Sequence, residues 1–370
     1  MKITVIPDSF KGTLSSKEVG DIISERIRYY HPDYEVRNYE VADGGEGTAD
    51  VFLNNLNSVK EYVTVSGPYR ESVQTYYCMT EDGKTAIIES ACCIGLPLVE
   101  GRKDPSLTTT CGVGEMILDA VRKGAETVIL GLGGSCSNDG GCGIAYALGA
   151  RFYDSYGHGF MPVGATLSEI ERIDISRTLK VNLICMCDVN NPFYGPNGAA
   201  YVYGPQKGAD EEMVSELDEG LRNLSDKFRE CLGKDISQLA GAGAAGGIAG
   251  GLKAMFDCEL KPGIETVLDL IGFDELLNDC DLVISGEGRF DTQSLQGKVI
   301  DGILKRCRKH DVPLMVIAGS SKIDKAEGIK AIYSTLSNQR KMPADKQQAI
   351  DNLKETCDEI FSQKLFFNQE

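Results

Sequence analysis

Short patches that combine glycine with acidic, amide or hydroxyl side chains recur along this 370-residue chain. Glycine lets backbone N–H groups approach an anion closely, and carboxylates bind a hard cation or accept a proton. Their recurrence side by side indicates phosphate and metal chemistry. The patches occupy residues 8–12, 43–48, 131–141, 188–192, 204–209, 241–247, 286–291 and 297–298.

The chain begins with alternating strand and helix signals. Residues 2–6 predict a short buried strand, and Ser15 with Glu18 forms a capping box at the start of a helix whose apolar stripe reaches Ile27. Residues 34–39 predict a second strand and residues 49–56 a second helix. The first two patches therefore lie between a strand and a helix, where open α/β sheets bind their ligands.

The middle of the chain shows a different pattern of predicted secondary structure. Residues 59–89 predict an antiparallel meander, and strand and helix signals alternate again further on. The expected fold class is α/β, with a doubly wound parallel sheet built from both chain ends and an inserted mixed α/β domain. We expect domain boundaries near residues 60 and 280, so that residues 1–60 and 280–370 form one domain and residues 61–279 the other. Later predicted strands are 127–130, 181–187, 281–285 and 313–317, and later predicted helices are 113–123, 142–148, 210–231 and 299–308.

Composition narrows the function classes. A formal net charge of −17 disfavours nucleic-acid binding, and no apolar run approaches the ~20 residues that span a bilayer. The thirteen cysteines are odd in number, and no signal peptide is visible, so we expect reduced thiols in a cytoplasmic protein.

Histidine chemistry is nearly excluded, because none of the three histidines lies in a patch. Residues 204–208 lack the spacing of a P-loop, and the GxGxxG in residues 241–246 follows no clear strand. The patch at residues 241–246 is either a closely packed glycine-rich helix or a backbone wall against a nucleotide. The remaining inventory of carboxylates, lysines, an arginine and backbone amides suits phosphoryl transfer.

Residues 131–141 are the best candidate for a phosphate-binding loop, because they follow a buried strand and precede a helix. Asp139 in this loop is either a metal contact or a helix cap. The candidate nucleotide-binding residues are Gly133, Gly134, Ser135 and Asn138.

Charged residues in the other patches are candidates for catalysis, each with a structural alternative as a turn, cap or surface residue. Lys11 could pair with an anionic substrate, and Ser9, Asp43 and Glu46 could contact it. Arg289 could stabilise charge. Asp188, Glu287 and Asp291 could bind metal or serve as a base, and a salt-bridged loop is the less favoured alternative for the last two.

Taken in order, the patches resemble those of the bacterial type I glycerate kinase family, from residue 8 to about 320. The resemblance implies ATP-dependent phosphorylation of D-glycerate with Mg²⁺, most often to 2-phosphoglycerate. It also implies a flavodoxin-like domain made from both chain ends, an inserted domain and a site in the cleft between them. In this scheme Lys11 and Arg289 neutralise substrate charge, while Asp188, Glu287 or Asp291 binds Mg²⁺ or accepts a proton.

Other functions stay open at this point. The chain could phosphorylate another small hydroxy acid, or the 3-hydroxyl of glycerate. It could also be a non-catalytic sensor of glycerate or nucleotide, although the retained charged patches argue against this. A homo-oligomer is compatible with the sequence.

Overall fold

The computed structural model describes residues 1–370 except 11, 42–47, 296, 337–341 and 363–370. Its contacts divide the chain into two compact units. The terminal unit contains Met1–Asp43 and Ile264–Glu370, and the inserted unit contains Gly44–Gly263. Within the described ranges, no helix has both the length and the apolar character needed to cross a membrane.

The terminal unit is built on a five-stranded sheet in which every neighbouring pair is parallel. In the chain order of this unit, the strands lie in the sequence 2-1-3-4-5, which is the flavodoxin-like order. The predicted α/β fold class is thereby confirmed. The strands are β1 (Lys2–Val5), β2 (Glu35–Asn38), β12 (Leu282–Ser285), β14 (Leu314–Ala318) and β16 (Ile329–Ser334), and a short parallel pair, β13 (Arg289–Phe290) and β15 (Ser320–Ser321), follows β12 and β14.

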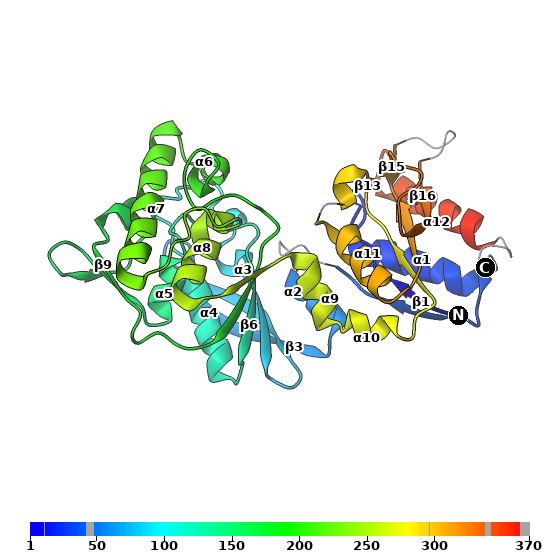
Figure 1. Ribbon diagram of the computed structural model, residues 1–370, viewed down its shortest axis with the longest axis horizontal. Coiled ribbons are helices and arrows are strands. Elements are labelled where there is room, and N and C mark those ends of the chain that lie inside the picture. The colour runs from blue at the N-terminus through cyan, green and yellow to red at the C-terminus, as the bar shows by residue number, and fades with distance from the viewer. Residues whose placement is uncertain (11, 42–47, 296, 337–341, 363–370) are drawn as a thin grey trace. The chain divides into compact units, whose positions relative to one another are not determined.

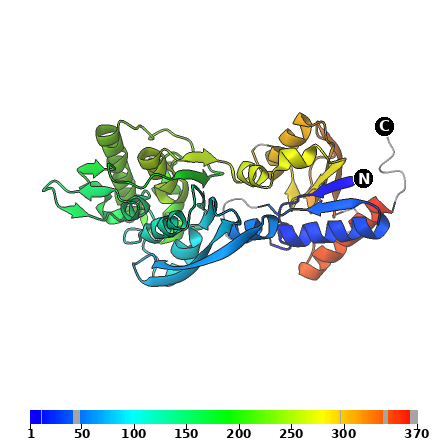
Figure 2. The same cartoon turned by 90° about the horizontal axis from the view of Figure 1, so that it is seen from below.

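Helices cover both faces of this sheet (Figures 1 and 2). On one face α1 (Ser16–Tyr30) packs against α12 (Lys346–Phe361), and the predicted capping box of Ser15 and Glu18 starts α1. Alternate strand residues such as Ile3 and Val5 point into this layer, as the period of two requires. The other face carries α9 (Gly263–Leu270), α10 (Phe273–Leu277), α11 (Val299–Lys309) and the short 3-10 helix η4 (Thr292–Leu295).

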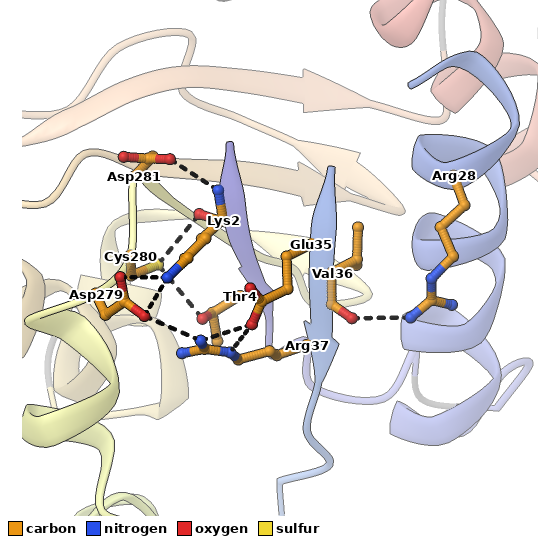
Figure 3. A network of polar contacts seen from close by, with 9 residues as sticks. All are labelled: Lys2, Thr4, Arg28, Glu35, Val36, Arg37, Asp279, Cys280 and Asp281. Atoms are coloured by element: carbon orange, nitrogen blue, oxygen red, sulfur yellow. Dashed lines mark hydrogen bonds and ion pairs between the residues drawn. The ribbon is translucent and has the colours of Figure 1, made fainter. Parts of the chain in front are cut away.

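A polar network holds the amino-terminal edge of the same sheet (Figure 3). Lys2 Nζ donates to Asp279 Oδ1 at 2.6 Å, and its backbone N–H donates to Asp281 at 2.7 Å. Arg37 on β2 bridges to Glu35 and, at 3.3 Å, to Asp279. Because exposed ion pairs each contribute at most about 1 kcal/mol, this network helps to set the strand register while the apolar core supplies the stability.

The inserted unit contains a six-stranded mixed sheet. Four strands are parallel, and the last two continue antiparallel, which confirms the predicted meander. In spatial order the strands are β11 (Glu259–Lys261), β10 (Asn182–Met186), β6 (Thr127–Gly131), β5 (Thr85–Glu89), β4 (Ser72–Thr80) and β3 (Ser58–Ser66).

Helices α4 (Cys111–Arg122), α5 (Cys142–Ala147) and α8 (Ala244–Phe256) share one apolar core with this sheet. A second core surrounds the long helix α7 (Glu211–Leu232) and a small sheet of β8 (Gly159–Phe160), β7 (Arg151–Tyr153) and β9 (Arg172–Asp174). The shorter helices are α2 (Thr48–Asn55), α3 (Ala91–Ile94) and α6 (Ala199–Tyr203), with 3-10 turns η1 (Leu96–Val99), η2 (Gly164–Glu169) and η3 (Pro205–Lys207).

The start of α8 packs directly on the loop that follows β6. Ala245, Gly246 and Gly247 all have positive φ, at 54°, 69° and 87°. A Cβ at Gly246 would lie 2.0 Å from the carbonyl oxygen of Ser137. A Cβ at Gly251 would lie 1.8 Å from that of Gly140. The GxGxxG patch therefore serves close backbone packing here, the first of its two interpretations.

This packing makes Gly246→Ala more destabilising than the matched variant Gly233→Ala. Gly233 also has positive φ, at 67°, but an added Cβ there would meet nothing within 4 Å. Gly233→Ala should therefore cost about 1–2 kcal/mol of backbone strain. Gly246→Ala adds a clash with backbone and should cost about 1–3 kcal/mol more. Urea denaturation measures both, and equal losses would contradict the packing role.

Candidate functional site

The loop between β6 and α5 is rich in unused hydrogen-bond donors. Several of its backbone N–H groups find no acceptor within the described part of the chain. Gly134 is exposed and has a φ of 77°, so the backbone itself forms the outer surface there. N–H groups left open at the end of a parallel strand can bind an anion. These donors belong to Gly133, Gly134, Ser135, Ser137 and Asn138.

Asp139 closes the loop as a cap. Its buried carboxylate accepts from the N–H groups of Thr110, Gly141 and Gly143 and from the Thr110 hydroxyl, at 2.8 to 3.2 Å. Burial raises the pKa of Asp139, although these hydrogen bonds oppose the increase. Of its two interpretations, the structure supports the helix cap, because four donors already occupy the carboxylate.

Two neighbouring side chains are buried without partners. Ser137 and Asn138 are both 0% exposed. Ser137 Oγ and both polar atoms of Asn138 lack a hydrogen-bond partner among the described residues. Because each unsatisfied buried group costs about 1–3 kcal/mol, three in two residues mark a place where a ligand or water would be stabilised.

Lys207 lies behind this loop and was not predicted as a site residue. Its ammonium group donates to the Ser137 carbonyl oxygen at 2.6 Å and to Ser135 Oγ at 3.2 Å. Burial lowers the pKa of Lys207 to about 8. Apart from the position of the lysine in a glycine-proline patch, no sequence pattern indicates this placement, because burial of a lysine depends on tertiary packing.

In the terminal unit, Asp8 and Glu287 flank the point where the strand order reverses. Asp8 follows β1 and Glu287 follows β12, and the Asp8 N–H donates to the Gly286 carbonyl oxygen at 2.7 Å. Ligands of doubly wound sheets bind at this switch point. Ser9 lies beside it, half-buried, and its N–H donates to Asp8 Oδ1 at 2.7 Å.

Glu287 has the properties of a proton acceptor. Its Oε1 is buried and has no hydrogen-bond partner among the described residues. Burial raises the pKa of Glu287 to about 7, and the negative charges of Asp8 and Asp291 add to the increase. A hydrogen bond with Ser294 and the charge of Lys298 oppose it. A carboxyl that titrates near neutral pH is suited to general base chemistry.

Arg289 and Asp291 extend from the same strand end. Arg289 is largely exposed, and its Nε lies 3.4 Å from Asp291 Oδ2. Asp291 also accepts from the Gln293 N–H at 3.0 Å, at the start of η4. The salt bridge considered in the sequence analysis is therefore present. The charged groups considered there for catalysis lie in the same loop.

Of the other candidate residues, one lies in the inserted unit and three lie outside the described residues. Asp188 belongs to the inserted unit, follows β10 and accepts from the Gly263 N–H at 3.0 Å. Lys11, Asp43 and Glu46 lie outside the described residues. In the described ranges, no three histidine, cysteine, aspartate or glutamate side chains gather as a ready metal site.

The chain is similar to known proteins over nearly its whole length. The glycerate kinase family model matches residues 3–364. The glycerate 2-kinase of Escherichia coli K12 is 41% identical over 362 residues, 95% of each chain, and the glycerate kinase of Bacillus subtilis 168 is 39% identical over 369 residues, 97% of each. A crystal structure of a protein assigned as glycerate kinase 2 from Salmonella typhimurium LT2 has a TM-score of 0.86 and 37% identity, covering 98% of this chain and 97% of that one. This chain therefore belongs to the glycerate kinase family and is an enzyme of the kinase class.

Proposed function

We propose that this enzyme transfers the γ-phosphoryl group of ATP to the 2-hydroxyl of D-glycerate, with Mg²⁺, and releases 2-phosphoglycerate and ADP. Family membership supports glycerate and ATP as the substrates. The choice of the 2-hydroxyl follows the E. coli relative, which is a glycerate 2-kinase.

The observation that carries the chemistry is the carboxyl group of Glu287. It stands at the switch point of the sheet, with a buried unpartnered oxygen and a pKa near 7. In the proposed step, Glu287 accepts the proton of the 2-hydroxyl while that oxygen bonds to the γ-phosphorus. The bond from the γ-phosphorus to the bridging oxygen breaks, and ADP leaves with the electron pair.

The loop after β6 would bind the phosphate groups of ATP. Its open N–H groups and the unpartnered Asn138 side chain are donors of the kind that hold phosphate oxygens. Lys11 and Arg289 would neutralise the glycerate carboxylate or the γ-phosphate. Ser9, Asp43 and Glu46 would contact glycerate.

The residues present fit Mg²⁺, because it binds through one or two carboxylates and fills its other positions with water and phosphate oxygens. Asp291 and Asp8 act electrostatically on Glu287 and would supply those carboxylates. Asp188 is a further candidate ligand. When bound, the ion would neutralise charge on the transferring phosphate.

We also propose a cytoplasmic location. ATP is available there, and a reducing compartment would preserve the thirteen free thiols of the chain.

The product identity tests this function directly. Purified protein with millimolar D-glycerate and Mg-ATP should release ADP and a product that enolase converts to phosphoenolpyruvate without added mutase, because enolase accepts 2-phosphoglycerate. L-glycerate, lactate and longer hydroxy acids serve as the comparison panel, and removal of the divalent ion by chelation should stop turnover. No ADP release would refute the function, and a 3-phosphoglycerate product would refute the assigned hydroxyl.

Glu287→Gln should lower kcat by about 100- to 10,000-fold, because the amide cannot accept the proton. In the unmodified enzyme, kcat/KM should fall about tenfold per pH unit below pH 7, since the carboxylate is then protonated. The exposed Glu275→Gln in α10 is the control and should retain full activity. A variant with normal kcat would remove Glu287 from the mechanism.

The same variant should not lose stability at alkaline pH. Because the folded-state pKa is raised above its ordinary value of 4.5, the Glu287 contribution to stability is greatest below pH 4.5 and declines as pH rises through 7. At pH 8 the ionised group opposes folding, so Glu287→Gln should melt at the same temperature as the parent or higher. Thermal unfolding at pH 5 and 8 measures the difference, and a lower melting temperature at pH 8 would indicate a structural role.

A further inference from the structure

Lys207 places a positive charge inside the inserted unit without a carboxylate beside it. The residue is 2% exposed. Among the described residues, no carboxylate oxygen lies within the 4.0 Å of an ion pair from its Nζ. Buried charges in proteins are normally paired, because removing an ammonium group from water is costly. The buried carboxylate of Asp139 acts on Lys207 electrostatically from beyond ion-pair distance, and it already accepts four hydrogen bonds. The position therefore favours a further anion in contact with the ammonium group.

The hydrogen bonds of Lys207 are directed to the loop after β6. Its ammonium group has three donors, and two of them go to the Ser137 carbonyl oxygen and Ser135 Oγ. Since Ser135 Oγ accepts from Lys207, its own hydrogen is available to donate elsewhere. In a trans peptide the N–H lies opposite the C=O, so the bond to Ser137 turns the Asn138 N–H away from Lys207.

A second observation comes from the side chains of the loop. Ser137 Oγ and the Asn138 amide are buried without partners in the described part of the chain. In the same loop, the backbone N–H groups of Gly133 and Gly134 have no acceptor among the described residues. The buried ammonium group, the donating hydroxyl and the open N–H groups are all hydrogen-bond donors. Donors of this kind are suited to bind an anionic oxygen group.

We propose that Lys207 is the buried counter-charge and positioning residue of an anion site formed by residues 133–138, which takes a phosphate or carboxylate group. The inference rests on the proposed function, in which the same loop binds the phosphates of ATP. The carboxylate of glycerate offers the same chemistry, and binding measurements separate the two sources.

The charge of Lys207 also predicts a pH dependence. Burial lowers its pKa to about 8, while the Cys136 thiol and the Asp139 carboxylate, the titratable groups that act on it, favour the charged form. As pH rises through 8 the ammonium group loses its proton, and the loop loses its counter-charge. Affinity for the anion should therefore decline above pH 8.

Lys207→Met tests the site on the full chain. At pH 7, calorimetric titrations with Mg-ATP and, separately, with D-glycerate should show at least about tenfold weaker binding of one of them, because a charge-assisted hydrogen-bond network is lost. Weaker binding of Mg-ATP identifies a phosphate site, and weaker binding of D-glycerate identifies a carboxylate site. Lys103→Met is the matched control, since Lys103 is exposed and reaches the Gln206 carbonyl oxygen of the same turn at 3.5 Å. Unchanged binding of both ligands would overturn the proposal.

The unmodified protein provides a test that needs no variant. Its affinity for the same anion should fall severalfold between pH 7.5 and 9.5, and Lys207→Arg should remove that fall because arginine keeps its charge. Equal affinity for both ligands across this range would count against the site. If the parent protein phosphorylates glycerate while Lys207→Met binds both ligands normally, the Lys207 role fails and the proposed function stands. Absence of turnover in the parent protein would refute the proposed function itself.

Discussion

The close approach of two backbone segments fixes the geometry of the donor-rich loop. Gly246 lies against the Ser137 carbonyl group and Gly251 against that of Gly140, at separations that leave no room for a side chain. The Gly140 N–H also donates to the Gly246 carbonyl oxygen at 3.1 Å. Helix α8 packs in the apolar core of the inserted unit. Its contact with the loop therefore restrains a segment that has few internal hydrogen bonds. Preorganised donors of this kind stabilise charge without having to reorient.

Glu287 and Lys207 are buried titratable groups whose environments disfavour their charged forms. Glu287 in the terminal unit and Lys207 in the inserted unit both have pKa values shifted toward neutrality by burial. Elsewhere the chain pairs its half-buried charges closely, as Arg306 does with Glu265, Asp269 and Asp274 at 2.5 to 2.6 Å. The contrast favours a functional role for Glu287 and Lys207, because a fold selected for stability alone would have paired them.

Much of the fold could be predicted from the sequence, because strand signals, the capping box of Ser15 and Glu18, and the alternation at both chain ends are local patterns. The small sheet of β7, β8 and β9 could not, since strands of two or three residues carry no periodicity. The loop at residues 131–141 was found through its glycines and its place after a strand. The burial of Lys207 could not be predicted, because it depends on packing between distant segments of the chain. Spacing alone also left the role of Asp291 undecided. In the structure its carboxylate accepts from the Gln293 N–H and pairs with Arg289, and its role as a metal ligand stays a prediction.

The assembly of the terminal unit from both chain ends has a consequence for folding during synthesis. β1 and β2 emerge first, but β12, the neighbour of β1 on its other side, begins about 240 residues after the end of β2. Until then one edge of β1 has no partner strand, while the contiguous inserted unit can complete its own sheet. We therefore expect the inserted unit to fold first on the ribosome. The terminal unit, and Glu287 with it, would form only near the end of translation.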